Sequence, residues 1–223
     1  MAALAMFTPQ CLLCHRPAPK ALCALCSAQV SALVHSRTEP LRRVPGTLVP
    51  IYSFASYHGV VRDLVRIAKG LRLERSELLD PWLWLAASRL GDSLLGLRPS
   101  LIVPLPEPRY GLDSRRRLAR DFAQLLASQL QVPCHAQLLR HAWPLKSYFR
   151  TPQKERRRVM RVLEPPDFCV PRSSGALPEG ERIVIVDDVC TTGETLRAAI
   201  KALSTQGITV SAAALLADTP SYG

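Results

Sequence analysis

The sequence has no unbroken apolar run long enough to cross a membrane as a helix, which takes about 18 residues or more. The best candidate, residues 78–97, is interrupted by Asp80, Pro81, Arg89 and Asp92. The apolar N-terminus carries no basic residue before Thr8 and Pro9, so it lacks the pattern of a secretory signal. We therefore expect a cytoplasmic protein without a membrane span.

Internal repeats and low-complexity tracts are also lacking. The 223 residues are 48% hydrophobic and 21% charged, a composition typical of folded chains rather than of disordered ones. A chain of this length buries roughly 70% of its unfolded surface, which is enough for one core and a small appendage.

Acidic residues and lysines are scarce. There are 18 acidic residues against 29 basic ones, which gives a net charge of +11, and only five of the basic residues are lysine. Residues 109–161 hold 13 basic and three acidic residues, so most of the excess lies in one stretch. Arginine favours bidentate phosphate contacts, although a GC-rich genome would also raise its count. The nucleic-acid candidates are two arginine runs: Arg115, Arg116, Arg117 and Arg156, Arg157, Arg158.

Seven cysteines are present, and four of them form two Cys-x-x-Cys pairs, Cys11 with Cys14 and Cys23 with Cys26. Each pair can chelate a metal from one tight turn, and four thiolates suit a tetrahedral zinc ion. Disulfides are the alternative, which a cytoplasmic compartment disfavours. We predict a structural Zn²⁺ site, with no role assigned to Cys134, Cys169 or Cys190 beyond packing of the last.

Apolar periodicity beyond the cysteine pairs predicts alternating strands and helices. Strands are expected over 51–55, 100–103, 182–186 and 209–216, and helices over 60–71, 82–97, 114–130 and 195–204. Residues 36–50 have the composition of a linker, and residues 165–180 that of an irregular loop. The alternation predicts an α/β domain with a mainly parallel sheet, placed after the cysteine module.

The segment with the clearest chemistry runs from the β-branched residues 183–186 into the following turn. Two carboxylates, Asp187 and Asp188, are expected where the strand ends, and ligands of open α/β sheets bind beyond that edge. The turn holds Thr191, Thr192, Gly193, Glu194 and Thr195. Its amides and hydroxyls can surround a phosphate at a helix N-terminus, while the carboxylates can accept hydrogen bonds from a diol. The pattern therefore indicates a sugar-phosphate site; the alternative is that the aspartates only cap a turn.

This strand, Asp-Asp and Thr-Thr-Gly-x-Thr arrangement resembles the phosphoribosyl-pyrophosphate (PRPP) signature of type I phosphoribosyltransferases. Nearly the whole chain resembles the ComF family, proteins associated with natural competence and DNA uptake. The likeness rests on the four-Cys module, the segment from Tyr57 to Lys69, the segment from Val103 to Pro106, and the pair Glu155 and Arg156. Many relatives have an Arg-Gly-Phe-Asn-like segment after the loop that corresponds to residues 103–106. This chain has Arg117-Leu-Ala-Arg120-Asp121 in its place, without glycine or asparagine.

The resemblance implies two domains: residues 1–45 as zinc module and linker, and 46–223 as a phosphoribosyltransferase-like domain with a hood (51–98) and a core (99–217). It implies that Asp187 and Asp188 hold the ribose hydroxyls and that residues 191–195 hold the 5′-phosphate. Pro104, Leu105 and Pro106 would mark the pyrophosphate loop. Mg²⁺ would be bound mainly by PRPP, and Lys69, Arg109 or the run from Arg115 to Arg117 could neutralise the leaving group.

Two functions remain open from the sequence. One is a Mg²⁺-dependent phosphoribosyltransferase whose acceptor and catalytic residues are unassigned. The other is a non-catalytic protein of the same fold that binds single-stranded DNA or docks a helicase or recombination partner. The arginine runs would supply the phosphate contacts, and Trp143, Tyr148 and Phe149 could stack on bases.

Overall fold

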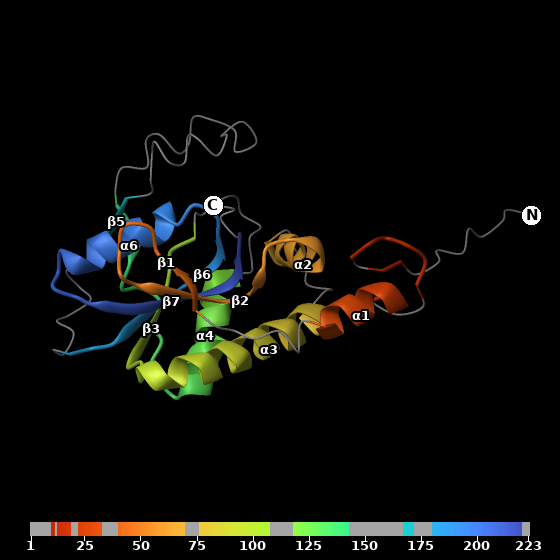
Figure 1. The fold of residues 1–223 in the computed structure, drawn as a ribbon, viewed down its shortest axis with the longest axis horizontal. Coiled ribbons are helices and arrows are strands. Elements are labelled where there is room, and N and C mark those ends of the chain that lie inside the picture. The colour runs from red at the N-terminus through yellow and green to blue at the C-terminus, as the bar shows by residue number, and fades with distance from the viewer. Residues whose placement is uncertain are drawn as a thin grey trace, which may run out of the picture.

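A five-stranded sheet lies at the centre of the fold in the computed structural model (Figure 1). The structure describes residues 10–11, 13–18, 22–32, 40–69, 76–107, 118–142, 167–171 and 180–219. The strand order is β1-β2-β7-β6-β3. The strands are β1 (Pro40–Arg43), β2 (Pro50–Ser56), β3 (Leu101–Pro104), β6 (Ile183–Cys190) and β7 (Val210–Asp218). Four of them run parallel, and β1 is antiparallel at one edge. The carboxyl ends of β2, β3, β6 and β7 therefore share one edge of the sheet.

Helices cover both faces of this sheet. One face packs against α2 (Gly59–Lys69), α3 (Ser76–Leu94) and α4 (Leu118–Leu130), and the other against α6 (Glu194–Ser204). Along β6, Val184 and Val186 belong to the first core, whereas Ile183 and Ile185 belong to the second. This alternation follows from the two-residue period of a strand, and it confirms the expected α/β fold with a mostly parallel sheet.

The N-terminal four-Cys segment packs on the side of α2. Its helix α1 (Ala24–Ala32) contacts α2. Cys11, Leu13 and Cys26 share one buried cluster with Val61 and Leu64 of α2. The module therefore adds to the core on this face of the sheet.

The expected linker over 36–50 is wrong for its described part, since Pro40–Arg43 forms β1 and pairs with β2. The helix expected from residue 82 begins earlier, at Ser76, and includes Pro81. Pro81 removes one backbone hydrogen bond near the start of α3, but Trp82 and Leu83 directly after it are buried. Tertiary packing thus outweighs the local preference, and α3 ends at Leu94 with a 3-10 turn, η3 (Leu95–Leu97), after it.

Two further differences concern long-range pairing. The strand expected to end at residue 186 continues to Cys190, because it pairs with β7 as far as Asp218. Part of the expected loop over 165–180 is a short strand, β5 (Phe168–Cys169), which pairs with β4 (Arg140–His141). No strand-length periodicity exists in two residues, so the sequence could not reveal β4 or β5.

The domain boundaries stay predictions, but β2 falls inside the range expected for a hood and pairs with β7 in the central sheet. It therefore belongs to the core rather than to a separate layer. None of the helices in the described ranges is both long enough and apolar enough to span a membrane.

Candidate functional site

Two adjacent aspartates, Asp187 and Asp188, form an acidic doublet in the second half of β6, toward the carboxyl edge of the sheet. Asp188 faces α2, the helix that carries its ion-pair partner. Asp188 is 6% exposed. Its Oδ2 is 2.7 Å from Nζ of Lys69, the last residue of α2. The buried carboxyl group thus has a cationic partner, which offsets part of the free-energy cost of removing it from water.

Asp187 is in a different electrostatic state. Burial and the neighbouring Asp188 raise the pKa of Asp187 to about 8, against the opposing hydrogen bond that its Oδ1 accepts from the Asp188 amide at 2.8 Å. At neutral pH its carboxyl group is therefore mainly protonated in the absence of a ligand. The doublet combines one ion-paired carboxylate with one that can take up or release a proton near neutral pH.

Glu107 is a third acid of this site. Burial raises its pKa, and the Ala119 amide in the first turn of α4 donates a hydrogen bond to its Oε1 at 2.6 Å. Asp188 and Lys69 both act on it electrostatically. Glu107 was not predicted from the sequence: it lies directly after the proposed pyrophosphate loop, beyond the end of β3, and no pattern of neighbouring residues marks it.

The turn from residue 191 to 193 leads directly into α6. Gly193 precedes the helix with φ = 81° and ψ = 0°, a left-handed conformation that other residues rarely adopt. The Thr192 hydroxyl accepts a 3.5 Å hydrogen bond from the Glu194 amide, and Glu194 pairs with Arg197 one turn along the helix. Since α6 is eleven residues long, its N-terminal amides and dipole favour an anion at this turn.

The segment predicted as the pyrophosphate loop lies next to the doublet. Pro104 ends β3 opposite Val186, and the Leu105 amide donates to the Val186 carbonyl at 2.8 Å. His141 donates a hydrogen bond to the Pro106 backbone and stacks near Phe168, with ring centroids 5.1 Å apart. Adjacent parallel strands therefore bring this loop and the doublet to one edge, and β4 and β5 support the loop from the side.

The four cysteine Sγ atoms of the N-terminal module all lie within 4.8 Å of one another, and those of Cys14 and Cys23 are 3.7 Å apart. A tetrahedron with Zn–S bonds of about 2.3 Å has S–S edges of about 3.8 Å. The donor set and spacing therefore fit a zinc ion with four thiolates and no open coordination position.

The remaining cysteines do not join a cluster of metal ligands within the described residues. Cys190 is buried, and burial together with Asp218 raises the pKa of its thiol to about 12, so it is an inert packing residue. Cys134 is half-buried and Cys169 exposed.

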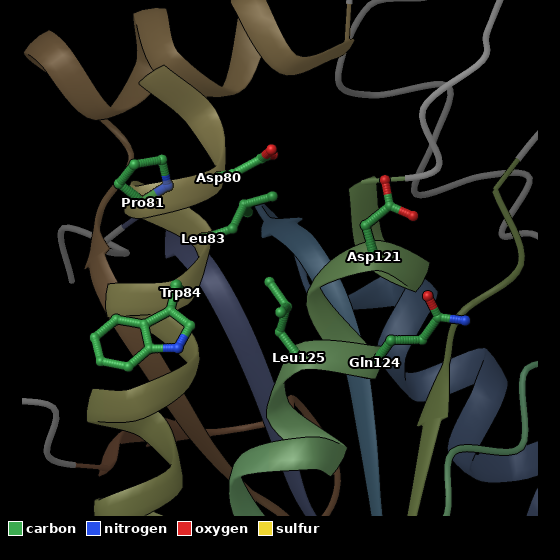
Figure 2. A pocket seen from close by; sticks show the side chains of 7 residues that line it. All are labelled: Asp80, Pro81, Leu83, Trp84, Asp121, Gln124 and Leu125. Atoms are coloured by element: carbon green, nitrogen blue, oxygen red, sulfur yellow. The ribbon is translucent and has the colours of Figure 1, made fainter. Parts of the chain in front are cut away.

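A pocket of about 690 Å³ lies between α3 and α4 (Figure 2). Asp80, Pro81, Leu83 and Trp84 line it from α3, and Asp121, Gln124 and Leu125 line it from α4. The charge of Asp121 acts on Glu107, but neither Asp187 nor Asp188 lines the pocket. The cavity is separate from the candidate sugar-phosphate site.

Several sequence candidates lie outside the described residues. They are Arg109, a candidate for neutralising the leaving group, and the basic and aromatic residues of the nucleic-acid hypothesis: Arg115, Arg116, Arg117, Trp143, Tyr148, Phe149, Arg156, Arg157 and Arg158. The structure places the acidic doublet, the turn 191–195, Pro104 to Pro106 and Lys69 together at the carboxyl edge.

Comparison with known proteins finds similarity to phosphoribosyltransferases. The family model described as phosphoribosyl transferase domain matches residues 117–223. The adenine phosphoribosyltransferase of Kineococcus radiotolerans is 36% identical over 81 residues, which are 36% of this chain and 43% of that protein. The adenine phosphoribosyltransferase of Maricaulis maris is 44% identical over 48 residues, which are 22% of this chain and 27% of that protein.

Among solved structures, the crystal structure of a purine phosphoribosyltransferase from Pyrococcus horikoshii Ot3 aligns with a TM-score of 0.40 and 23% identity, over 62% of this chain and 74% of that one. The chain spans less than half the length of the two curated relatives that it matches. The matches in sequence support a type I phosphoribosyltransferase domain in the C-terminal half of the chain, which includes the acidic doublet and the turn after it.

Proposed function

We propose that the chain is a phosphoribosyltransferase-like protein of the ComF family that binds PRPP or a related ribose phosphate at the carboxyl edge of the sheet. The observation that carries the proposal is the placement of Asp187 and Asp188 beside the Gly193-led N-terminus of α6. Carboxylates accept hydrogen bonds from a diol, and a helix N-terminus favours a phosphate. The two together fit a phosphorylated pentose.

In this proposal the doublet binds the ribose hydroxyls, residues 191–195 bind the 5′-phosphate, and the backbone from Pro104 to Pro106 borders the pyrophosphate. Lys69 neutralises Asp188 while no ligand is bound. Once hydroxyl groups satisfy Asp188, the flexible ammonium group is free to turn toward a phosphate. Mg²⁺ would arrive with PRPP, whose pyrophosphate supplies most of its ligands.

The reaction of this class is displacement of pyrophosphate from C1 of the ribose by a nucleophile, through an oxocarbenium-like state. Neutralisation of the departing pyrophosphate is the main demand on the protein, and Lys69 is the described cation that already lies at the doublet. Adenine is the first acceptor to assay, since both sequence relatives are named for it.

Calorimetric titration of the full chain with PRPP and Mg²⁺ tests the proposal. Binding is expected for the natural sequence and should be lost in Asp188→Asn and Asp187→Asn. Asp92→Asn is the matched control, because Asp92 is exposed on α3. No binding at millimolar PRPP by the natural sequence would overturn the proposal.

We also propose that the four cysteines hold one structural Zn²⁺. The mutual distances of the Sγ atoms, all below 4.8 Å, support this. A zinc ion there would fasten the loop between the two Cys-x-x-Cys pairs onto the core that it shares with α2. Metal analysis should give one zinc per chain, and a fully folded chain that contains no metal would contradict the assignment.

Single-stranded DNA is a second candidate ligand, in the competence or DNA-processing context that the ComF resemblance implies. The ten excess positive charges over residues 109–161 favour it. Binding should weaken steeply between about 50 and 200 mM salt, and charge reversal at Arg156, Arg157 and Arg158 should abolish it. Absence of binding, or binding without salt dependence, would exclude this role; a helicase or recombination partner would then be sought through the zinc module.

A further inference from the structure

The edge strand β1 and the turn after it contact the segment before α6 that is proposed to bind the 5′-phosphate. This segment, residues 191–195, is called the phosphate turn below. β1 is the antiparallel strand of the sheet and lies within the segment that has a linker composition. Arg42 in β1 and Pro45 in the turn after β1 contact residues 190–193. Nothing in the type I signature, which covers only the strand and turn themselves, calls for such contacts.

Arg42 joins three points at the carboxyl edge. Its Nε and Nη2 donate to the Asp218 carboxylate at 2.8 and 2.6 Å, and Asp218 is 2% exposed at the end of β7. The same Nη2 lies 3.3 Å from the Cys190 Sγ and 3.5 Å from the Thr191 carbonyl oxygen, which accepts from it. The planar guanidinium group therefore ties the end of β7 to the first residue of the phosphate turn.

Pro45 contacts the glycine of the same turn. A Cβ atom placed on Gly193 would lie 2.6 Å from Cδ of Pro45 and 3.1 Å from its Cγ. The proline ring thus occupies the space that any side chain at position 193 would need. Gly193 is required here by contact as well as by its φ of +81°, and the Arg197 amide bonds to its carbonyl oxygen on the helix side at 2.9 Å.

We infer that Arg42 and Pro45 are positioning residues that hold the turn 191–195 in the conformation that binds the 5′-phosphate. The inference rests on the proposed function. A short threonine- and glycine-containing turn can point its amides in many directions, and each direction that must be abandoned on binding costs affinity. The contacts of Arg42 with Thr191 and of Pro45 with Gly193 remove that freedom before the ligand arrives, and neither Arg42 nor Pro45 needs to touch the ligand.

The test uses the full chain and ribose 5-phosphate, which has the phosphate and hydroxyls but no pyrophosphate. Removing Arg42 alone would leave Asp218 buried without its partner, which is itself destabilising. The informative variant is therefore Arg42→Met combined with Asp218→Asn, which removes both charges. We expect it to keep a melting temperature near that of the natural chain. It should bind ribose 5-phosphate about tenfold more weakly, because the charge-assisted hydrogen bond from Arg42 to the Thr191 carbonyl oxygen no longer holds the turn.

Two further variants separate positioning from general stability. Arg43→Met is the matched control on the same strand, since Arg43 is exposed, and it should bind normally. Arg42→Lys keeps the charge next to Asp218 but cannot bridge to Thr191 with the same fork, so it should restore stability more fully than affinity. Equal affinity of the double variant and the natural chain would overturn the inference.

Hydrogen exchange of the free protein gives a readout that needs no ligand. Amides 191–194 should exchange faster in the double variant than in the natural chain, while amides 183–186 should be unchanged. Equal exchange rates at 191–194 would overturn the positioning role even if ribose 5-phosphate binds. If the natural chain fails to bind ribose 5-phosphate and PRPP, the proposed function fails, and the inference fails with it.

Discussion

Replacing Asp187 with asparagine is expected to abolish ribose-phosphate binding and, at the same time, to stabilise the protein at neutral pH. The pKa of this carboxyl group is raised to about 8 from its ordinary value of 3.8, chiefly by burial and then by Asp188. Between these two values the folded chain holds a proton that the unfolded chain releases. Stability therefore falls as the pH rises from about 4 to about 8.

The size of the effect follows from the shift. Between pH 3.8 and pH 7 the raised pKa of Asp187 lowers the free energy of unfolding by about 4 kcal/mol, at about 1.36 kcal/mol per pH unit. Asparagine removes the ionisation but still has a polar amide to desolvate. We therefore expect a gain of about 2 kcal/mol at pH 7, which raises the melting temperature by about 5 °C in a chain of this size.

Urea unfolding at pH 5 and pH 7.5 measures both the gain and its pH dependence. The natural chain should lose stability between the two pH values, and Asp187→Asn should lose less. Asp92→Asn, at an exposed position, should behave like the natural chain. A destabilised Asp187→Asn protein at pH 7.5, or one with the same pH slope as the natural chain, would refute the view that Asp187 is held protonated in the free site.

Three other predictions concern the supports of the site. Lys69→Met leaves the buried Asp188 without its ion-pair partner, so it should cost about 1–3 kcal/mol in urea unfolding and weaken PRPP binding in titration; unchanged values for both would contradict it. Gly193→Ala should cost about 1–3 kcal/mol through its positive φ and its contact with Pro45, and Pro45→Ala should recover part of this loss; no recovery would show that backbone strain alone accounts for it. Cys26→Ser should reduce bound zinc below one per chain and lower the melting temperature, whereas a full complement of zinc would exclude Cys26 as a ligand.

The sequence predicts best what a single segment determines. The β-branched run at 183–186 predicts a strand buried on both faces, and the alternation of Val184 with Ile185 between the two cores confirms it. Gly193 predicts the bend before α6, because only glycine adopts its positive φ without strain. The spacing of the cysteines predicts the cluster of four sulfur atoms.

What the sequence could not predict depends on partners far along the chain. Arg42 lies 176 residues from Asp218, and no local pattern marks either of them as half of a pair. The proline-rich composition around β1 predicts a linker, yet pairing with β2 makes it an edge strand. Glu107 is unremarkable in sequence, and it joins the site only because β3 lies beside β6 and α4 begins near its carboxylate.

The acidic doublet also depends on the N-terminal module, through α2. The Oδ2 atom of Asp188 lies 2.7 Å from Nζ of Lys69, and Lys69 is positioned by α2, whose buried face includes Leu64 and Val65. That face shares its cluster with Cys11 and Cys26 and with residues of β2 and β6. Loss of the proposed zinc ion should loosen the packing on one side of α2 and hold Lys69 less firmly beside the buried carboxyl group of Asp188. We therefore predict that Cys26→Ser, which loses the proposed zinc ion, weakens PRPP binding as well as stability.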